Sequence, residues 1–298
     1  MNGEISSRLL VRDASRRLQD AGSESPYLDA LLLLATVWGV TRERLYTLLG
    51  DPVEPEAAQT FESLITRRSE GEPIAYLTGY KELFGQRFIE DHRVLVTRPD
   101  TEVIVETALG LYPEAGTAAI HDCCTGSGCV AISLAAAHPL CAVSMSDVSR
   151  DALTVAVNNS QAILGKVLPH WESDLLTIVP GQFDIITCNP PYLTDEEMKA
   201  VNGAEGNRAA PEHTPSHEPQ IALHGGRDGL EFVDRLLHGA LASLAPNGYI
   251  VLEVADAQAD QVAELLEAAG YRTVFVRTDL AGRRRVVGGQ ACPYLQAV

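Results

Sequence analysis

The amino-acid sequence predicts an α/β protein in which a doubly wound, mostly parallel sheet follows a small helical domain. Predicted strands and helices alternate from residue 97 to the end of the chain, which is the pattern of a parallel sheet with helices on both faces. Before that, apolar residues recur at helical spacing from residue 5 to about 69. A glycine-rich turn follows the first strand of the alternating part, and ligands of such sheets bind at the carboxyl ends of the strands.

The helical domain is expected at residues 1–70. Ser25-Pro26 and Asp51-Pro52 interrupt its apolar pattern where one helix ends and another begins. In residues 71–96, glycines separate several short apolar runs, so we expect a hairpin-like connector there. Residues 97–298 then form the second domain.

The second domain begins with a helix from Arg98 to about Leu111, for which Asp100 or Thr101 is a plausible cap. The later alternation predicts strands at residues 118–123, 141–146, 183–188, 249–254, 274–277 and 285–287, and helices at 129–137, 150–164, 230–244 and 257–269. The segment from Val201 to Pro219 is rich in Gly, Ala, Pro, His and Glu, and we expect it to form a mobile loop.

Composition indicates a globular protein outside the membrane. Apolar residues make up 46% of the chain and charged residues 21%, which is ordinary for a globular domain. No apolar run approaches the roughly 20 residues of a membrane span, and the first residues lack the basic start and apolar core of a signal peptide. The six cysteines show no paired CxxC spacing, so we expect free thiols in the cytoplasm and no membrane association.

The charge of the chain argues against general nucleic-acid binding. Forty acidic against 23 basic residues give a net charge of −17, which repels phosphate backbones. Arg67-Arg68 and Arg283-Arg284-Arg285 leave a local basic patch open, although short arginine runs more often face solvent or form ion pairs. We expect no direct contact with nucleic acid.

The turn from Asp122 to Gly128 has the features of a nucleotide site. It follows the first strand of the sheet and opens a helix, and its glycines permit a tight turn with close backbone approach to a ligand. Asp147 ends the next predicted strand, where a carboxylate can accept both ribose hydroxyls of an adenosine. Because Ala131 completes a GxGxxA pattern, the glycine spacing alone does not separate NAD from S-adenosylmethionine, and a turn that only lets helix and strand pack is the structural alternative.

Asp174 and Leu175 come at the expected end of a third strand. The carboxylate of Asp174 could accept the amino group of adenine, while Leu175 could pack on the ring. Taken alone, Asp174 would be an ordinary surface residue.

The tetrapeptide Asn189-Pro190-Pro191-Tyr192 follows the apolar strand that ends at Cys188. Two prolines fix the backbone, so the Asn189 amide oxygen and the Pro190 carbonyl can converge on one planar NH2 group while the Tyr192 ring stacks on its face. Asn-Pro alone is more typical of a turn that ends a strand, but all four residues after a buried strand favour a site. An adenosine site beside a pocket for a planar nitrogen predicts methyl transfer from S-adenosylmethionine, since hydride transfer would leave this pocket unexplained.

Over nearly its whole length, the chain resembles the protein-(glutamine-N5) methyltransferases of the HemK/PrmC family. The resemblance rests on an ordered set of segments: 25–35, 71–76, 98–102, 122–128, Asp147, 189–192, 218–219, 222–223, 225–226, 228–230, 279–282 and 285–287. It implies a class I S-adenosylmethionine-dependent methyltransferase fold. It also implies methylation of the glutamine in the Gly-Gly-Gln motif of peptide-chain release factors, which the amino-terminal domain helps to grip.

The resemblance and the motifs together define a set of expected site residues. Expected contacts of the cofactor, which leaves as S-adenosylhomocysteine, are Cys124, Thr125, Gly126, Ser127, Gly128, Asp147, Asp174, Leu175 and Asn189. The expected contacts of the substrate amide are Asn189, Pro190, Pro191 and Tyr192, with Asn189, Pro190 and Tyr192 taking part in catalysis. No side chain need act as a general base, because two acceptors on the amide N–H groups position the nitrogen and raise its electron density.

Some residues depart from the family pattern or suggest other functions. Thr97 stands where proline is usual and Arg284 where an acidic residue is common, and with the segment 201–219 they leave open a related N-methyltransferase that acts on another amide or amine. A DNA adenine methyltransferase and a cofactor-binding module without catalysis are weaker alternatives. His213 and His217 lack supporting ligands, so we expect no metal, and Cys123, Cys124 and Cys129 are explained as buried small hydrophobes. Oligomeric state is left open.

Overall fold

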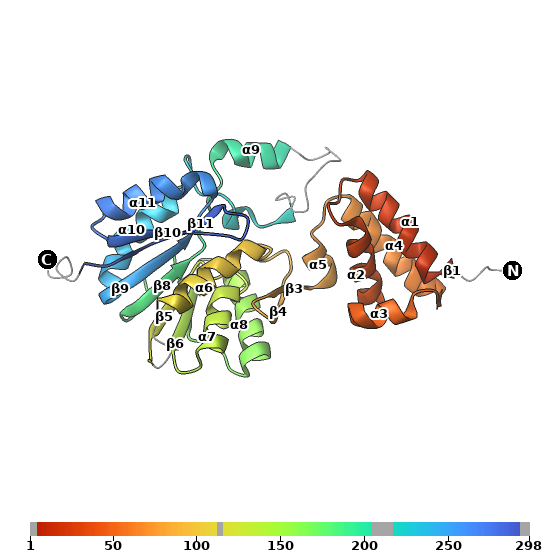
Figure 1. Cartoon of the computed structure of the whole chain (residues 1–298), viewed down its shortest axis with the longest axis horizontal. Coiled ribbons are helices and arrows are strands. Elements are labelled where there is room, and N and C mark those ends of the chain that lie inside the picture. Colours follow the sequence, from red (N-terminus) through yellow and green to blue (C-terminus); the bar gives the residue numbers. More distant parts are fainter. Residues whose placement is uncertain (1–4, 112–115, 204–216, 293–298) are drawn as a thin grey trace. The chain divides into compact units, whose positions relative to one another are not determined.

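The computed structural model describes residues 5–111, 116–203 and 217–292, which fall into two compact units (Figure 1). One unit contains the described residues up to Tyr80 together with 200–203 and 217–218. The other contains residues from Lys81 to Lys199 and those from Pro219 onward. Each unit has its own apolar core.

The first unit is a small helical bundle, as the apolar spacing predicted. Its helices are α1 (Ser7–Asp20), α2 (Pro26–Trp38), α3 (Arg42–Leu48), α4 (Pro55–Ser69) and α5 (Ile74–Thr78), and two short strands, β1 (Ile5–Ser6) and β2 (Pro52–Val53), pair in antiparallel fashion. Leu18, Leu34 and Phe61 are fully buried between the helices. A buried ion pair, Arg68 Nε to Asp29 Oδ2 at 2.8 Å, links α4 to α2.

Residues 71–96, where we expected a hairpin-like connector, contain a helix before the hairpin. Helix α5 comes first, and strands β3 (Tyr80–Leu83) and β4 (Gln86–Ile89) then form a two-stranded sheet. A helix of five residues is too short to show a helical period in the sequence, which is why it was not predicted.

The second unit is built on a seven-stranded sheet with the order β10-β11-β9-β8-β5-β6-β7. Its strands are β5 (Ala119–Cys123), β6 (Ala142–Asp147), β7 (His170–Glu172), β8 (Phe183–Cys188), β9 (Leu244–Glu253), β10 (Arg272–Thr278) and β11 (Arg284–Gln290). Strands β5 to β9 pair in parallel, whereas β11 is antiparallel to both of its neighbours. The mostly parallel, doubly wound sheet is therefore confirmed.

Helices cover both faces of this sheet (Figure 1). They are α6 (Glu102–Gly110), α7 (Cys129–Ala137), α8 (Arg150–Leu164), α10 (Glu231–Ser243) and α11 (Ala259–Ala268). Two large apolar clusters, one on each face, bury residues such as Ile186 and Leu252 on one side and Ile120 and Met145 on the other. The clusters fix the strands, so the loops at the carboxyl ends of the strands are held in place.

Two local predictions for this part of the chain were incomplete or wrong. Helix α9 (Asp195–Gly203) was not predicted, and residues 204–216 of the expected loop lie outside the described residues. Neither Asp100 nor Thr101 caps α6 with its side chain, because the helix is entered through a 3-10 turn. Asp100 instead forms an ion pair with Arg285 at 2.8 Å.

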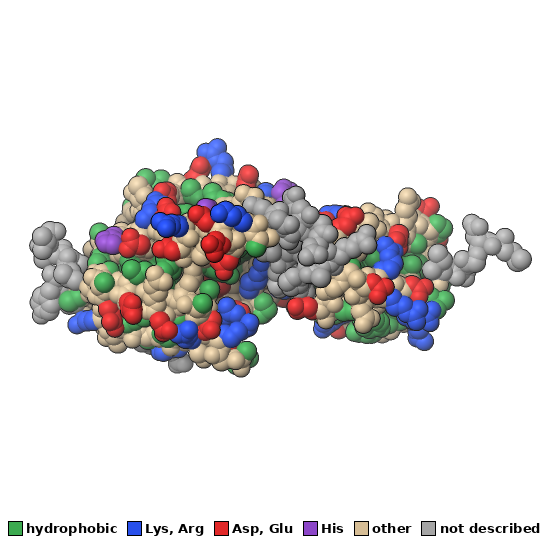
Figure 2. All heavy atoms as spheres, turned by 90° about the horizontal axis from the view of Figure 1, so that it is seen from above, with side chains coloured by type: hydrophobic (Ala, Val, Ile, Leu, Met, Phe, Trp, Pro, Cys, Tyr) green, Lys and Arg blue, Asp and Glu red, His purple; other side chains and the backbone are tan. Residues whose placement is uncertain are grey.

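The surface and the thiols agree with the composition. On the face shown in Figure 2, the Lys and Arg side chains of the described residues lie among Asp and Glu. The arginines at 283–285 all form ion pairs with aspartates. Ion pairing was one of the interpretations that the sequence left open for this cluster, beside a local basic patch. All six cysteines are free thiols. Among the described residues, no helix has the length and apolar character needed to cross a bilayer.

Candidate active site

A cavity of about 320 Å³ opens where four parallel strands of the second unit end. Its walls come from the segments that follow β5, β6, β7 and β8, and from residues near α6 and α10. Of the expected site residues, those that line it are Cys124, Thr125, Gly126, Ser127, Asp147, Asp174, Leu175, Asn189 and Pro191. The parallel register thus brings residues from four separate loops to one cavity.

The two glycines of the turn after β5 have different roles. Gly126 has a φ of +56°, lines the cavity and has open space where a Cβ would stand. Gly128, with a φ of +80°, instead faces Ile132 and Ala156, and a Cβ there would lie 2.8 Å from Ile132 Cδ1. The first glycine therefore leaves room for a ligand, while the second lets α7 approach α8, so the packing explanation holds for Gly128 only.

Asp147 is held at the cavity by backbone donors. Its Oδ2 accepts from the Gly126 N–H at 2.9 Å and its Oδ1 from the Ser149 N–H at 2.9 Å. Each carboxylate oxygen can accept a second hydrogen bond, so both remain able to bind a pair of hydroxyls. Burial raises the pKa of Asp147 to about 6, although the two backbone N–H donors lower it.

Leu175 and Asp174, the two residues expected near an adenine ring, differ in their exposure to solvent. Leu175 is buried and has a φ of +51°, in the left-handed region that is uncommon for a branched residue. Asp174 is exposed, and its Oδ2 accepts from Arg235 Nη2 of α10 at 2.5 Å. Arg235 also lines the cavity, and no sequence pattern pointed to it, because α10 is distant along the chain.

Asn189 carries the unpartnered acceptor of the site. Its Oδ1 is buried and has no hydrogen-bond partner among the described residues. Leaving such an acceptor unpaired costs about 1–3 kcal/mol, so a donor from a bound molecule would be favoured there. The Asn189 side chain is also hydrogen-bonded to Glu253, and because a carboxylate accepts, this bond directs the amide NH2 toward Glu253 and leaves Oδ1 available.

Glu253 at the end of β9 is a supporting residue that the sequence analysis missed. Burial raises its pKa to about 7, against the Thr101 hydroxyl, Arg285 and Asn189, which lower it. Its Oε2 lacks a hydrogen-bond partner in the described part of the chain. The available signal was an acidic residue inside the apolar strand 249–254, where a charge is costly without a specific reason.

Asp122, in β5, directly precedes the glycine-rich turn. The sequence analysis named it only as the first residue of the segment 122–128 and gave it no role of its own. It is buried, and it accepts from Thr125 Oγ1 at 2.6 Å and from Thr187 Oγ1 at 2.7 Å. Burial raises its pKa to about 7 in spite of these two donors. The carboxyl group thereby ties the turn after β5 to the neighbouring strand β8.

Pro190 and Tyr192 are not among the residues that line the cavity, although both belong to the tetrapeptide. A glycine-containing turn packs against the backbone of the tetrapeptide. A Cβ on Gly225 would lie 2.6 Å from the Pro191 carbonyl oxygen, and a Cβ on Gly229 would overlap the Tyr192 carbonyl oxygen. Gln258 Nε2 also donates to the Tyr192 carbonyl at 3.1 Å. The Gly-rich segment after residue 224 therefore positions the tetrapeptide.

The two residues that depart from the family pattern lie in different places. Thr97 is buried beside the cavity, with its Oγ1 3.4 Å from Ser127 Oγ and its N–H donating to Glu90. Arg284 lies at the surface and forms ion pairs with Asp256 and Asp260. Thr97 thus lies against the turn that is expected to hold the cofactor.

The raised carboxyl pKa values predict that stability falls as pH rises. Glu253, Asp122 and Glu90 each have a pKa raised to about 7 mainly by burial, above the ordinary values near 4 that apply to the unfolded chain. The folded state therefore binds more protons between about pH 4 and pH 7, and the free energy of unfolding decreases across that window. Chemical denaturation at pH 5.5 and pH 8 should give the larger free energy of unfolding at pH 5.5.

Glu253→Gln tests one contribution to this pH dependence. The variant should lose about 2 kcal/mol of the difference between the two pH values, since the Glu253 pKa of about 7 lies about 1.5 units above the lower pH and one pKa unit corresponds to about 1.4 kcal/mol. The exposed Glu267→Gln is the matched control and should keep the full difference. Equal pH dependence in Glu253→Gln and the parent chain would contradict the buried carboxyl assignment.

The sheet order, the Gly-rich turn and the cavity define a class I methyltransferase. A family model described as the PrmC N-terminal domain matches residues 10–79, and one described as the methyltransferase small domain matches residues 103–213. Among solved structures, a methyltransferase from Pyrococcus furiosus has a TM-score of 0.51 and 19% identity, covering 70% of this chain and 90% of that one. The latter likeness concerns the fold alone.

Relatives with known names narrow the class. The release factor glutamine methyltransferase of Cereibacter sphaeroides is 37% identical over 281 residues, covering 94% of this chain and 96% of that protein. The protein of the same name from Moorella thermoacetica is 37% identical, covering 93% and 96%, and that from Deinococcus radiodurans is 36% identical, covering 94% and 96%. This chain belongs to the release factor glutamine methyltransferase family.

Proposed function

We propose that this chain transfers the methyl group of S-adenosylmethionine to the side-chain amide nitrogen of the glutamine in the Gly-Gly-Gln motif of peptide-chain release factors. Membership of the family supports the reaction. The structural observation that carries the proposal is the buried, unpartnered Oδ1 of Asn189 at the wall of the cavity. An amide NH2 is a donor of the kind that this acceptor lacks.

The residues around the cavity fit the proposed cofactor. When bound, S-adenosylmethionine supplies an electrophilic methyl group on a positively charged sulfur. The residues Cys124 to Ser127 of the turn would contact its methionine part, and Asp147 would accept the two ribose hydroxyls. Asp174 and Leu175 would lie on the adenine side, with Arg235 fixing the Asp174 carboxylate at 2.5 Å. The open space at Gly126 supports this placement.

The substrate amide would be held by acceptors, without a side-chain base. The lone pair of an amide nitrogen is delocalised into its carbonyl, so the nitrogen is a poor nucleophile. Asn189 Oδ1 would accept one N–H and the Pro190 carbonyl the other, while the Tyr192 ring stacks on the amide plane. These contacts orient the nitrogen and increase its electron density, and the fixed hydrogen-bond acceptors are already in place before the reaction.

The helical part of the chain is proposed to recognise the protein substrate. In this scheme residues 1–70 contact the release factor, residues 71–96 connect the two domains, and residues 97–298 form the methyltransferase domain that catalyses the reaction. Free thiols and a substrate from the translation machinery support a cytoplasmic location.

A transfer assay with matched substrates tests the function. With labelled S-adenosylmethionine, a release factor that carries the motif glutamine should accept one methyl group per molecule, mapped to that residue by mass spectrometry of peptides. A release factor whose motif glutamine is replaced by asparagine should accept none, because the shorter side chain cannot bring its amide to the methyl group. A release factor with a different, surface glutamine replaced is the control and should be methylated fully.

Two results would contradict the release-factor assignment. One is equal labelling of the release factor with and without the motif glutamine. The other is efficient methylation of a small amide or amine under conditions where the release factor is untouched, which would favour the related N-methyltransferase instead. In both cases, cofactor binding measured by calorimetry shows whether the protein was competent.

A further inference from the structure

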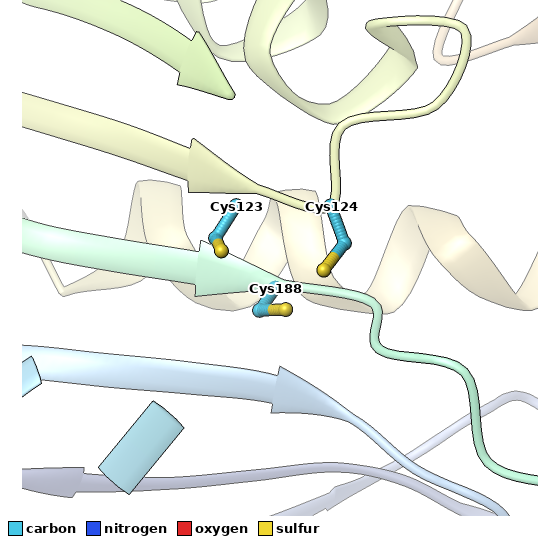
Figure 3. Close-up of side chains that lie close together, drawn as sticks. All are labelled: Cys123, Cys124 and Cys188. Carbon is cyan, nitrogen blue, oxygen red and sulfur yellow. The ribbon is translucent and has the colours of Figure 1, made fainter. Parts of the chain in front are cut away.

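Three cysteine thiols meet beside the cavity. Cys123 is the last residue of β5, Cys124 follows it, and Cys188 is the last residue of β8. Their Sγ atoms all lie within 4.8 Å of one another, and Figure 3 shows the side chains gathered at the ends of the two strands. The cluster unites residues that are far apart in the sequence.

The backbone explains why all three side chains converge. Cys123 and Cys188 are register partners on the neighbouring parallel strands β5 and β8. Successive residues of a strand point to opposite faces, so an extended Cys124 would point away from Cys123. Cys124 instead has a φ of +56°, in the left-handed region that favours glycine. This conformation brings its thiol toward the other two, and non-glycine residues held there are concentrated at functional sites.

The size and access of the cluster suit a metal ion. Zinc–sulfur bonds of about 2.3 Å place two thiolates of a tetrahedral site about 3.8 Å apart, so the observed separations need only a small closure. Cys123 and Cys188 are at most 1% exposed, whereas Cys124 is half-buried and lines the cavity, which gives an ion a path to the cluster.

We propose that Cys123, Cys124 and Cys188 form a trithiolate site for a soft d10 cation such as Zn²⁺ or Cd²⁺, with the remaining position of the ion open to the cavity. Thiolates are the ligands that soft cations prefer. Each thiol gives up its proton to solvent when its sulfur binds the ion, so up to three protons are released per ion and no electron is transferred. The site differs from our expectation from the sequence, in which these cysteines only filled the core.

A metal ion bound to the three cysteines should compete with the binding of S-adenosylmethionine or S-adenosylhomocysteine. This part rests on the proposed function, in which Cys124 contacts the methionine part of the cofactor. An ion bound to Cys124 would occupy the same end of the cavity, so each ligand should weaken the other by the same factor. S-Adenosylhomocysteine is the suitable competitor because it carries no transferable methyl group.

Cadmium titration of the whole chain tests the site directly. Protein freed of metal and reduced with a phosphine should bind one Cd²⁺ with an ultraviolet thiolate-to-cadmium charge-transfer band and release of protons. Cys124→Gly removes one ligand at a backbone position that glycine favours, so the fold should persist, as circular dichroism can verify. Loss of a hydrogen-bond partner behind a ligand typically costs about 10- to 100-fold in metal affinity, and loss of this ligand should cost at least about 100-fold.

Matched variants separate this site from other thiols. Cys141→Ser alters a half-buried cysteine outside the cluster and should leave Cd²⁺ affinity unchanged. Cys188→Ala provides a second ligand deletion in case Cys124→Gly fails to fold. The proposal is overturned if either ligand deletion keeps the parent affinity, if Cys141→Ser loses as much, or if the folded parent binds no Cd²⁺. Cadmium binding that is unaffected by S-adenosylhomocysteine would refute the competition while leaving the ion site itself supported.

Discussion

Asn189→Ala is expected to lower kcat for methyl transfer to the release factor by about 10²- to 10³-fold, the range seen when one preorganised hydrogen-bonding group is removed from a catalytic site. The variant removes Oδ1, the buried acceptor without a partner, so the substrate amide loses its fixed contact. The fall in kcat is measured with the purified release factor at saturating cofactor.

The same variant should retain cofactor affinity within a few-fold, because Asp147 and the turn after β5 are unchanged. Asn158→Ala, on the exposed side of α8, is the matched control and should keep the parent kcat. Turnover of Asn189→Ala at the parent rate would refute the role given to this residue. Loss of cofactor binding in Asn189→Ala would show that the residue serves the cofactor and not the amide.

Asp147→Asn is expected to weaken cofactor binding by about 100-fold, because one charge-assisted hydrogen bond is worth about 1.5–3 kcal/mol. Asparagine is close in size, but only one of its two terminal atoms can accept. Since Gly126 and Ser149 already donate to the two carboxylate oxygens, the variant also leaves one of these backbone donors without an acceptor. Isothermal titration with S-adenosylhomocysteine gives the dissociation constant.

The pH dependence of binding gives an independent test of Asp147. Its pKa is raised to about 6, chiefly by burial, and the charged form is the better acceptor for the ribose hydroxyls. Affinity should therefore fall below pH 6, by up to about tenfold per pH unit, and this fall should vanish in Asp147→Asn. Asp151→Asn, exposed in the first turn of α8, should behave as the parent does. A variant with parent affinity at pH 8 would remove Asp147 from the proposed site.

Much of the fold could be predicted because strong local signals mark its elements. The predicted bounds of α7, α8 and β8 agree with the structure, since each is a clear apolar pattern ended by glycine, proline or a polar turn. Helix α5, with five residues, and α9, with a mainly polar sequence, give weak periodic signals. They were missed for that reason.

The candidate site was predicted in part. The loops that line the cavity follow strands, so their positions could be inferred from the order of the strands and the rule that ligands bind at carboxyl ends. Glu253 and Arg235 could not be assigned in this way, because their importance lies in their contacts with Asn189 and Asp174. Pro190 and Tyr192 were placed in the site by their motif, whereas neither lines the cavity, and their roles stay predictions.

The sequence by itself determined the class of fold, the order of the strands along the chain and the loops that carry the chemistry, because apolar periodicity and turn residues act over short distances. Only the tertiary structure decided which side chains meet. Parallel register sets Cys123 opposite Cys188, and a left-handed residue turns Cys124 toward both. The tertiary structure also brings Glu253 into hydrogen-bonding contact with Asn189 and leaves Asn189 Oδ1 without a partner among the described residues. Such meetings depend on the alignment of strands that are distant in the chain, and no local pattern encodes that alignment.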